Sequence, residues 1–234
     1  MPTRGFTLIE MILTIIIGSI LVLGITGFVE LGSRGYADTV ARQRIQTQAK
    51  FVLEKMTREL RHAVPNSFAI TQSSSQQQCL SFYPIVYSGF YHLEAKDSKQ
   101  LSFVVGNHTG GSAGLDFTGL KMMINPTHFS EFDSDTTITL SGSATKISLA
   151  KPLASQSVGQ RFYLYRDVVA YCLNLTTNMV TRNGIPVADS VVAGQFSYSD
   201  PTLQRGGVVH LSLGIAQNGE RSDFEQDVQV LNVP

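Results

Sequence analysis

The dominant pattern in the sequence is a long apolar run close to its start. Residues 6–29 read FTLIEMILTIIIGSILVLGITGFV, and Glu10 is the only charged residue among them. About 20 apolar residues in a helix cross a hydrocarbon layer of roughly 30 Å. The pattern therefore predicts a transmembrane helix over residues 6–29. Arg4 lies in the short segment before it, and the positive-inside rule favours a cytoplasmic position for that segment.

A second helical pattern follows the apolar run. Apolar residues recur mostly every three to five positions from Tyr36 to Leu60, and charged or other polar residues occupy most of the positions between them. This spacing predicts an amphipathic helix over residues 30–63 that continues the first helix and ends before Pro65. Its apolar side should pack on the rest of the protein. Gly32 and Gly35 are candidate positions for a kink.

Beyond Pro65 the pattern changes to short runs rich in Val, Ile, Phe, Tyr and Thr, which are typical of strands. Asn183-Gly184 and Asn218-Gly219 are typical of two-residue hairpin turns. Residues 73–78 and 106–114 should be exposed loops. The strand candidates are residues 79–87, 101–105, 136–140, 146–150, 161–165, 168–173, 208–213 and 227–233. The chain is therefore predicted to be α+β, with one long helix packed on a mostly antiparallel β domain.

Composition narrows the range of possible functions. Lys and Arg number 18 and Asp and Glu number 18, so no basic excess is present and nucleic-acid binding is not expected. The two cysteines are too few for an all-cysteine zinc site. The sequence contains no HExxH, P-loop or GxSxG motif. We therefore expect no catalytic residues, no metal site and no cofactor.

The residues at the start of the apolar run carry a resemblance to a known family. A short basic leader followed by GFTLIE (residues 5–10) and the apolar run resembles the class III signal of type IV pilins and type II secretion pseudopilins. In that family a prepilin peptidase cleaves after the glycine, here between Gly5 and Phe6. The same enzyme methylates the new N-terminal residue, here Phe6. The apolar helix then acts as membrane anchor and as the helix through which subunits polymerise.

The resemblance implies a division of the chain and a set of partners. Residues 1–5 would be a cleaved leader, 6–29 a transmembrane helix, 30–63 its amphipathic continuation and 64–234 a β-rich head. The protein would cross the inner membrane once with a periplasmic head, and would reach the pilus or cell surface after assembly. Its partners would be prepilin peptidase, the inner-membrane assembly platform, the lipid bilayer, and other major and minor pilins bound through the N-terminal helix.

Glu10 is unusual because it lies in an apolar helix. A carboxylate near a bilayer centre costs about 2.5–3.5 kcal/mol, so such residues usually have a partner. One interpretation places Glu10 at the membrane edge, where it reaches the lipid headgroups. The resemblance implies instead an assembly charge pair with the amino terminus of a neighbouring subunit, or with its own. Many major pilins have a proline where this chain has Gly27, and whether the helix melts there in a filament stays open.

Cys79 and Cys172 both lie in predicted strands. Beyond the membrane the compartment is oxidising, so the leading hypothesis is a disulfide between them. Two buried free thiols are the alternative.

The sequence is compatible with more than one subtype of pilin-like protein and with other classes of protein. Residues 53–67 (LEKMTRELRHAVPNS) are similar to the helix end of the MshO minor pilins of the mannose-sensitive haemagglutinin (MSHA) pilus system, which implies a role in pilus biogenesis in an initiating or tip complex. J-type pseudopilins of type II secretion share the size and the β-rich head. A membrane-anchored enzyme or ligand-binding protein is a rival class. A tip adhesin would need an exposed aromatic patch, but its candidate residues are more typical of a core: Phe82, Tyr83, Tyr87, Phe90 and Tyr91.

Replacing Gly5 with a bulky residue is expected to leave the leader attached, because the peptidase must admit a small side chain before the bond it cleaves. Mass spectrometry of the N-terminal peptide measures this directly. A wild-type protein recovered from membranes with Met1 still attached would contradict the class III signal.

Overall fold

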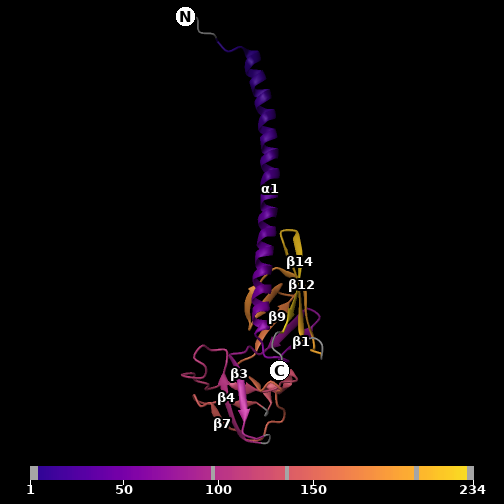
Figure 1. The fold of residues 1–234 in the computed structure, drawn as a ribbon. Helices are drawn as coiled ribbons and strands as arrows, with labels where there is room; N and C mark the ends of the chain where they lie inside the picture. Colours follow the sequence, from indigo (N-terminus) through magenta and orange to yellow (C-terminus); the bar gives the residue numbers. More distant parts are fainter. Residues whose placement is uncertain (1–4, 96–97, 135–136, 203–205, 231–234) are drawn as a thin grey trace.

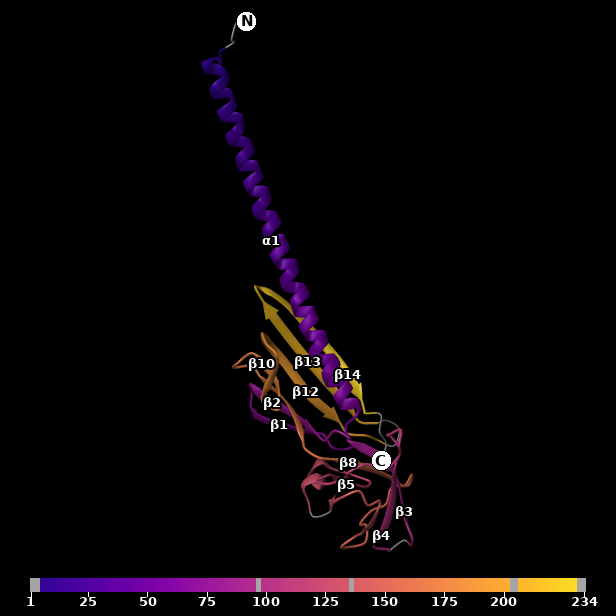
Figure 2. The same cartoon turned by 90° about the vertical axis from the view of Figure 1, so that its left-hand side faces the viewer.

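The fold is dominated by one very long helix that projects from a β-rich head (Figure 1). The computed structural model describes residues 5–95, 98–134, 137–202 and 206–230. The helix, α1 (Leu8–Arg61), has 54 residues and is therefore about 80 Å long. It continues nearly straight past Gly32 and Gly35, so the kink suggested there by the sequence is not a feature of this structure (Figure 2). The α+β fold predicted from the sequence is confirmed.

The two halves of α1 have different surroundings. The first half is apolar and exposed along its whole length. The second half buries one stripe of residues spaced three or four apart, which is the spacing of a single helix face. This stripe packs on the strands of the head, chiefly β13 (Val208–Gln217) and β14 (Glu220–Gln229). The buried residues are Ala41, Ile45, Ala49, Val52, Leu53, Met56 and Leu60.

Three antiparallel sheets form the head. The five-stranded sheet has the order β1-β2-β9-β10-β11 and comprises β1 (Ala69–Ser74), β2 (Gln77–Phe82), β9 (Val169–Asn174), β10 (Met179–Arg182) and β11 (Ile185–Ala188). The three-stranded sheet comprises β12 (Val191–Ser199), β13 (Val208–Gln217) and β14 (Glu220–Gln229) in that order. Together with the second half of α1, these two sheets enclose the main core.

The distal six-stranded sheet lies at the end of the molecule away from the first half of α1 (Figures 1 and 2). Its order is β6-β5-β8-β3-β4-β7, and it is accompanied by the short 3₁₀ helix η1 (Phe129–Asp133). Its strands are β3 (Tyr87–Leu93), β4 (Gln100–Val105), β5 (Lys121–Met123), β6 (Ile138–Thr139), β7 (Lys146–Ser148) and β8 (Arg161–Tyr165). It has a core of its own.

An aromatic cluster contributes to the packing of the distal sheet near the helix end. The ring of Tyr83 lies 4.8 Å from that of Phe132 and 5.0 Å from that of Tyr165, centroid to centroid. The Tyr165 hydroxyl donates to the carbonyl oxygen of Phe132 at 2.9 Å. Val64, which follows the end of α1, belongs to the same cluster. The cluster therefore ties the distal sheet to the chain segment that leaves the helix.

The two predicted hairpin turns are confirmed. Asn183 and Gly184 have φ values of 48° and 81° between β10 and β11, and Asn218 and Gly219 have values of 54° and 84° between β13 and β14. Positive φ at both central residues is the requirement of a type I′ turn, which explains the Asn-Gly choice.

Several strand boundaries differ from those predicted. The candidate at 79–87 covers the end of β2 and the first residue of β3, and the chain turns between them near Pro84, which lacks the N–H of a regular ladder. Residues 73–78 are the tip of the β1–β2 hairpin and not a loop. The candidate at 227–233 is wrong in extent: β14 is Glu220–Gln229, and residues 231–233 lie outside the described residues. The local sequence patterns did not predict β1, β5, β10, β11, β12 or any of β3 beyond its first residue.

A cluster of polar groups fixes the helix to the five-stranded sheet. The Glu59 carboxylate accepts from Arg182 Nε at 2.9 Å and from the Tyr171 hydroxyl at 3.1 Å, and it lies 3.2 Å from Lys55 Nζ. The Glu59 side chain is 19% exposed. Burial alone would raise the pKa of Glu59, but the hydrogen bonds from Arg182 and Lys55 outweigh it, so the pKa lies below its ordinary value.

We therefore expect Glu59→Gln to reduce the free energy of unfolding at pH 7 by about 1–3 kcal/mol. Because the folded-state pKa is lowered, the stabilisation is present above the unfolded-state pKa of about 4.3 and is lost as the pH falls through the lower folded value. Denaturant unfolding of the full chain in detergent from pH 7 to pH 3 measures the difference between wild type and variant, which should shrink as the pH falls.

The matched control is Glu54→Gln, which neutralises an exposed carboxylate on the same helix. It should leave the free energy of unfolding within about 0.5 kcal/mol of wild type. A pH-independent difference for Glu59→Gln would contradict the assigned ionic role.

Candidate functional site

The segment that carries the predicted cleavage site is exposed and lies outside the helix. Gly5, Phe6 and Thr7 precede the first turn of α1 and have no regular secondary structure. Phe6 is 69% exposed. A Cβ built on Gly5 would meet no atom within 4 Å, so this structure does not require glycine there. A requirement for glycine at this position would therefore come from an enzyme that acts on the segment.

Glu10 lies in the first turn of α1 with its side chain exposed. The Thr7 hydroxyl donates to a carboxylate oxygen of Glu10 at 3.5 Å, and the N–H of Glu10 donates to the carbonyl of Thr7 at 3.2 Å. Within the described part of the chain, Glu10 forms no ion pair. Its negative charge lies next to the positive end of the helix dipole, which is a favourable position for an anion. Phe6 is four residues before Glu10, about one helical turn along the chain.

The helix that follows Glu10 is long and apolar enough to cross a membrane. No residue in the most apolar stretch of this helix is buried within the protein. Gly18, Gly24 and Gly27 lie in this half, and a Cβ at any of them would meet no atom within 4 Å. The apolar surface is therefore open to lipid or to other helices, and the glycines would permit close helix contact.

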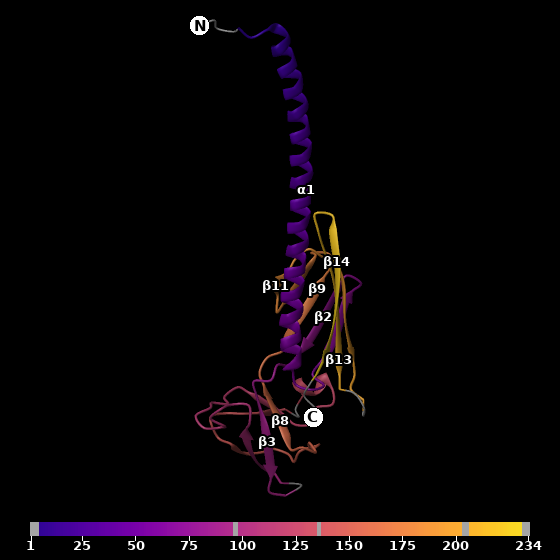
Figure 3. The ribbon, with the colours of Figure 1, turned by 45° about the horizontal axis from the view of Figure 1, so that its top comes forward.

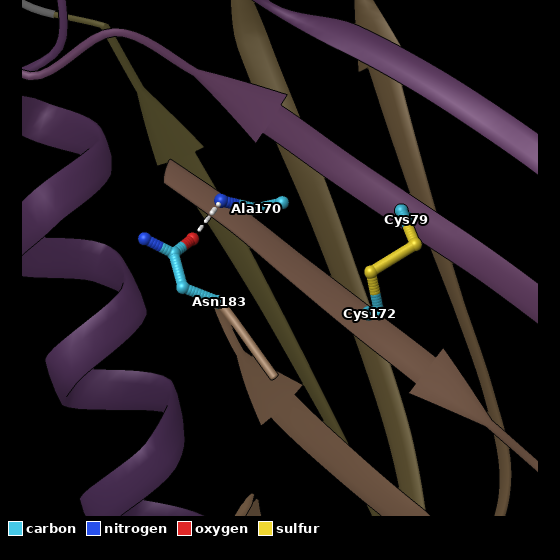
Figure 4. The surroundings of a disulfide bond; sticks show 4 residues. All are labelled: Cys79, Ala170, Cys172 and Asn183. Atoms are coloured by element: carbon cyan, nitrogen blue, oxygen red, sulfur yellow. Dashed lines mark hydrogen bonds between the residues drawn. A yellow bond between two sulfur atoms is a disulfide. The ribbon is translucent and has the colours of Figure 1, made fainter. Parts of the chain in front are cut away.

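Cys79 and Cys172 form the predicted disulfide. They lie directly opposite each other on the neighbouring strands β2 and β9, with Cα atoms 4.0 Å apart (Figure 4). In the turn after β10, the Asn183 side chain accepts from the N–H of Ala170 at 2.8 Å, so this turn is held to β9. The disulfide closes a separation of 93 residues that includes the whole distal sheet.

The aromatic residues considered for an adhesive patch are mostly core residues. Phe82, Tyr83 and Tyr91 are at most 3% exposed, and Tyr87 packs against the core of the distal sheet. Only Phe90 among the five is strongly exposed, at 59%. The interpretation of these aromatics as core residues is therefore confirmed for four of the five.

The structure brings together three residues that the sequence analysis did not connect. His210 Nδ1 lies 2.6 Å from Asp227 Oδ1, and His210 Nε2 lies 3.3 Å from the Ser199 hydroxyl. They come from three adjacent strands, and strand pairing cannot be derived from the local sequence. The Asp227 side chain is 70% exposed, so water screens its charge. A screened carboxylate would do little to stabilise an imidazolium in catalysis. The contacts among Ser199, His210 and Asp227 are explained by cross-strand pairing on an exposed sheet.

The described residues include no group of three or more His, Cys, Asp or Glu side chains placed to hold a metal ion. The expectations that the chain has no metal, cofactor or catalytic residue stay predictions.

Comparison with known protein families identifies one matching region. The prokaryotic N-terminal methylation motif matches residues 1–26. No curated protein and no solved structure gives a significant match. The chain therefore carries a type IV pilin-like prepilin signal, and this motif supports a pilin-like or pseudopilin-like protein. The signal and the exposed apolar helix fit a protein anchored in the membrane by a single helix.

Replacing both cysteines by serine is expected to lower the free energy of unfolding by about 2–4 kcal/mol, because the unfolded chain loses a cross-link over a long loop. Denaturant unfolding of the wild-type and Cys79→Ser/Cys172→Ser full chains measures this. On non-reducing electrophoresis only the wild type should migrate faster than its reduced form. Alkylation of two thiols in denatured but unreduced wild-type protein would refute the disulfide.

Proposed function

We propose that this protein is a minor pilin of an MSHA-like type IV pilus and that it takes part in pilus assembly within an initiating or tip complex. The observation that carries the proposal is the methylation motif at residues 1–26, which includes the first part of the exposed apolar helix. The division into leader (1–5), transmembrane helix (6–29), amphipathic helix (30–63) and head (64–234) is part of the proposal.

In this proposal, prepilin peptidase cleaves between Gly5 and Phe6 and methylates Phe6. The exposed, non-helical segment at residues 5–7 supports this role, because a peptidase must reach the backbone that it cleaves. After insertion, the head lies in the periplasm. The assembly platform then transfers the apolar helix from the bilayer to a growing filament, where it contacts other major and minor pilins.

Glu10 has a defined electrostatic role in this mechanism. The amino group of a mature Phe6 carries a positive charge that would enter the same apolar layer as the helix. An unmatched charge in a low-dielectric layer costs several kcal/mol. Glu10 forms no ion pair within the described residues, so its carboxylate is available to neutralise the amino group of a neighbouring subunit. The unpaired carboxylate thereby selects helices that present a free amino terminus.

The similarity of residues 53–67 to MshO minor pilins supports the pilus assignment over its main alternative, a J-type pseudopilin of a type II secretion system. The two assignments differ in where the protein is found. A minor pilin is expected in sheared surface filaments, together with a defect in pilus number when its gene is deleted. A pseudopilin is expected to be absent from such filaments, and its loss should abolish secretion of folded proteins instead.

We expect Glu10→Ala to insert and to be cleaved like the wild type, because removing the charge makes the segment more apolar. Assembly should fail, because a neighbour's ammonium group then stays unpaired in the apolar layer. Glu10→Gln should be intermediate, since an amide accepts a hydrogen bond but carries no charge. Mass spectrometry of the N-terminal peptide reports processing, and subunit abundance in sheared filaments reports assembly.

Glu30→Ala is the matched control for this experiment. Glu30 is an exposed carboxylate of the same helix, paired with Arg34 at 2.6 Å one turn away, and lies beyond the apolar segment. Its loss should leave filament abundance close to that of the wild type. Normal assembly of a processed, stable Glu10→Ala protein would show that apolar packing alone is sufficient and would overturn the charge-pair mechanism.

A further inference from the structure

The second half of α1 has an apolar stripe on the side that faces away from the head. Tyr36 is 74% exposed, Val40 is 45% exposed and Phe51 is 60% exposed. With 3.6 residues per turn, these positions fall on the side opposite to the buried stripe that contains Ile45 and Met56. Large apolar side chains on the polar half of the helix are not needed for packing on the head. We call this side, with its charged residues, the outer helix face.

The charged residues of the outer helix face are mainly basic. Arg44, Lys50 and Arg58 are exposed and, within the described part of the chain, form no ion pair. Glu54 is the exposed acidic residue among them. From Arg44 to Arg58 this basic row extends over about 21 Å of helix. The outer helix face therefore combines exposed aromatic side chains with positive charge.

The opposite charge gathers on the three-stranded sheet. Asp223, Glu225 and Asp227 alternate along β14 and are all exposed, while Phe224 and Val228 face the core. Alternate residues of a strand share one face, so the three carboxylates form a row on the outside of the sheet. Asp223 is paired with Arg221 and Asp227 with His210, whereas Glu225 forms no ion pair among the described residues. This row defines the acidic sheet face.

Small or polar residues continue the acidic sheet face across the sheet. Glu225 is directly opposite Ser212, which is directly opposite Gln195, and Asp223 is directly opposite Gly214. The surface beside Glu225 therefore has only small or uncharged side chains, while Arg221 and His210 lie beside Asp223 and Asp227. The length of the acidic row is about 13 Å. It is shorter than the whole basic row and close to the separation of Lys50 and Arg58, which is about 12 Å along the helix.

The two faces lie on opposite sides of the molecule. The helix is on one side and the three-stranded sheet is on the other, with the core between them (Figure 3). Two complementary faces on opposite sides of one chain cannot contact each other within that chain. They can contact each other between two copies, as a heterologous contact in which each copy uses a different face.

We propose that the outer helix face of one copy docks on the acidic sheet face of a second copy of this chain. This proposal rests on the proposed function, because it places two copies side by side with parallel membrane helices. Charge complementarity selects the orientation, and burial of Tyr36, Val40 and Phe51 supplies apolar contact. The net charge of the chain is zero, so the attraction arises from the distribution of charge and not from its sum.

The proposal is tested by cross-linking two differently tagged full-length copies in isolated membranes. One copy carries Thr47→Cys on the outer helix face and the other carries Gln195→Cys on the acidic sheet face, and both positions are exposed and uncharged. A bismaleimide reagent should link them. Arg44→Glu/Arg58→Glu in both copies should reduce the linked product at least about tenfold, and so should Asp223→Arg/Glu225→Arg.

Combining all four substitutions in both copies restores complementarity and should return the linked product to within about twofold of the original level. Lys99→Glu/Lys151→Glu is the matched control, since it changes net charge as much as the helix variant but at exposed positions of the distal part. It should leave the product unchanged. The product should also fall as ionic strength rises, because exposed charges are screened.

Three results would overturn the proposal. The first is no linked product with the original charges, and the second is undiminished product when either face alone carries its two charge reversals. The third is no recovery of the product when all four substitutions are combined. The last result would indicate that the acidic partner is a different subunit. The N-terminal peptide is analysed in the same samples. If Phe6 is methylated and cross-linking is unchanged by charge reversal, only this docking proposal is refuted. If the leader is retained, the proposed function is refuted whatever the cross-linking result.

Discussion

The packing of the second half of α1 against the head is the contact on which the rest of the structure depends. Its buried stripe includes alanines at positions 41 and 49, which allow close approach, and larger residues such as Ile45 and Met56, each of which contributes about 1.5–3 kcal/mol when buried. The Glu59 carboxylate adds a directional contact, because it accepts a hydrogen bond from Arg182 of the five-stranded sheet. Because the same helix continues into the apolar half, this contact also sets the position of the head relative to a membrane.

One continuous helix therefore serves two environments that require opposite surfaces. Its first half is apolar on all sides, which suits lipid or neighbouring helices but would be unfavourable in water. Its second half is apolar on the side that the sheets cover and charged over much of the remainder. The exposed Tyr36, Val40 and Phe51 interrupt that polar surface. They show that the requirement for water solubility does not by itself explain the sequence of this half.

Carboxylates inside the protein are paired within the chain, whereas some carboxylates on its surface are not, in the part of the chain that the structure describes. Glu59 is largely buried and has three partners, so its charge is compensated within the chain. Glu10 and Glu225 are exposed and form no ion pair among the described residues, which leaves their charges available for contacts between chains. The zero net charge of the protein conceals this arrangement. A carboxylate's role here follows from its surroundings and not from its residue type.

Features that depend on local chemistry were determined by the sequence alone. The apolar run, the methylation motif at residues 1–26, the helix end before Pro65 and the two Asn-Gly turns follow from composition and spacing within short segments. Features that depend on contacts between distant segments were decided only by the tertiary structure. The extra strands, the Glu59–Arg182 pair and the acidic row on β14 belong to this group, because strand pairing sets which side chains meet and which face water. The disulfide lies between the two: the sequence identified Cys79 and Cys172, and the pairing of β2 with β9 placed them opposite each other.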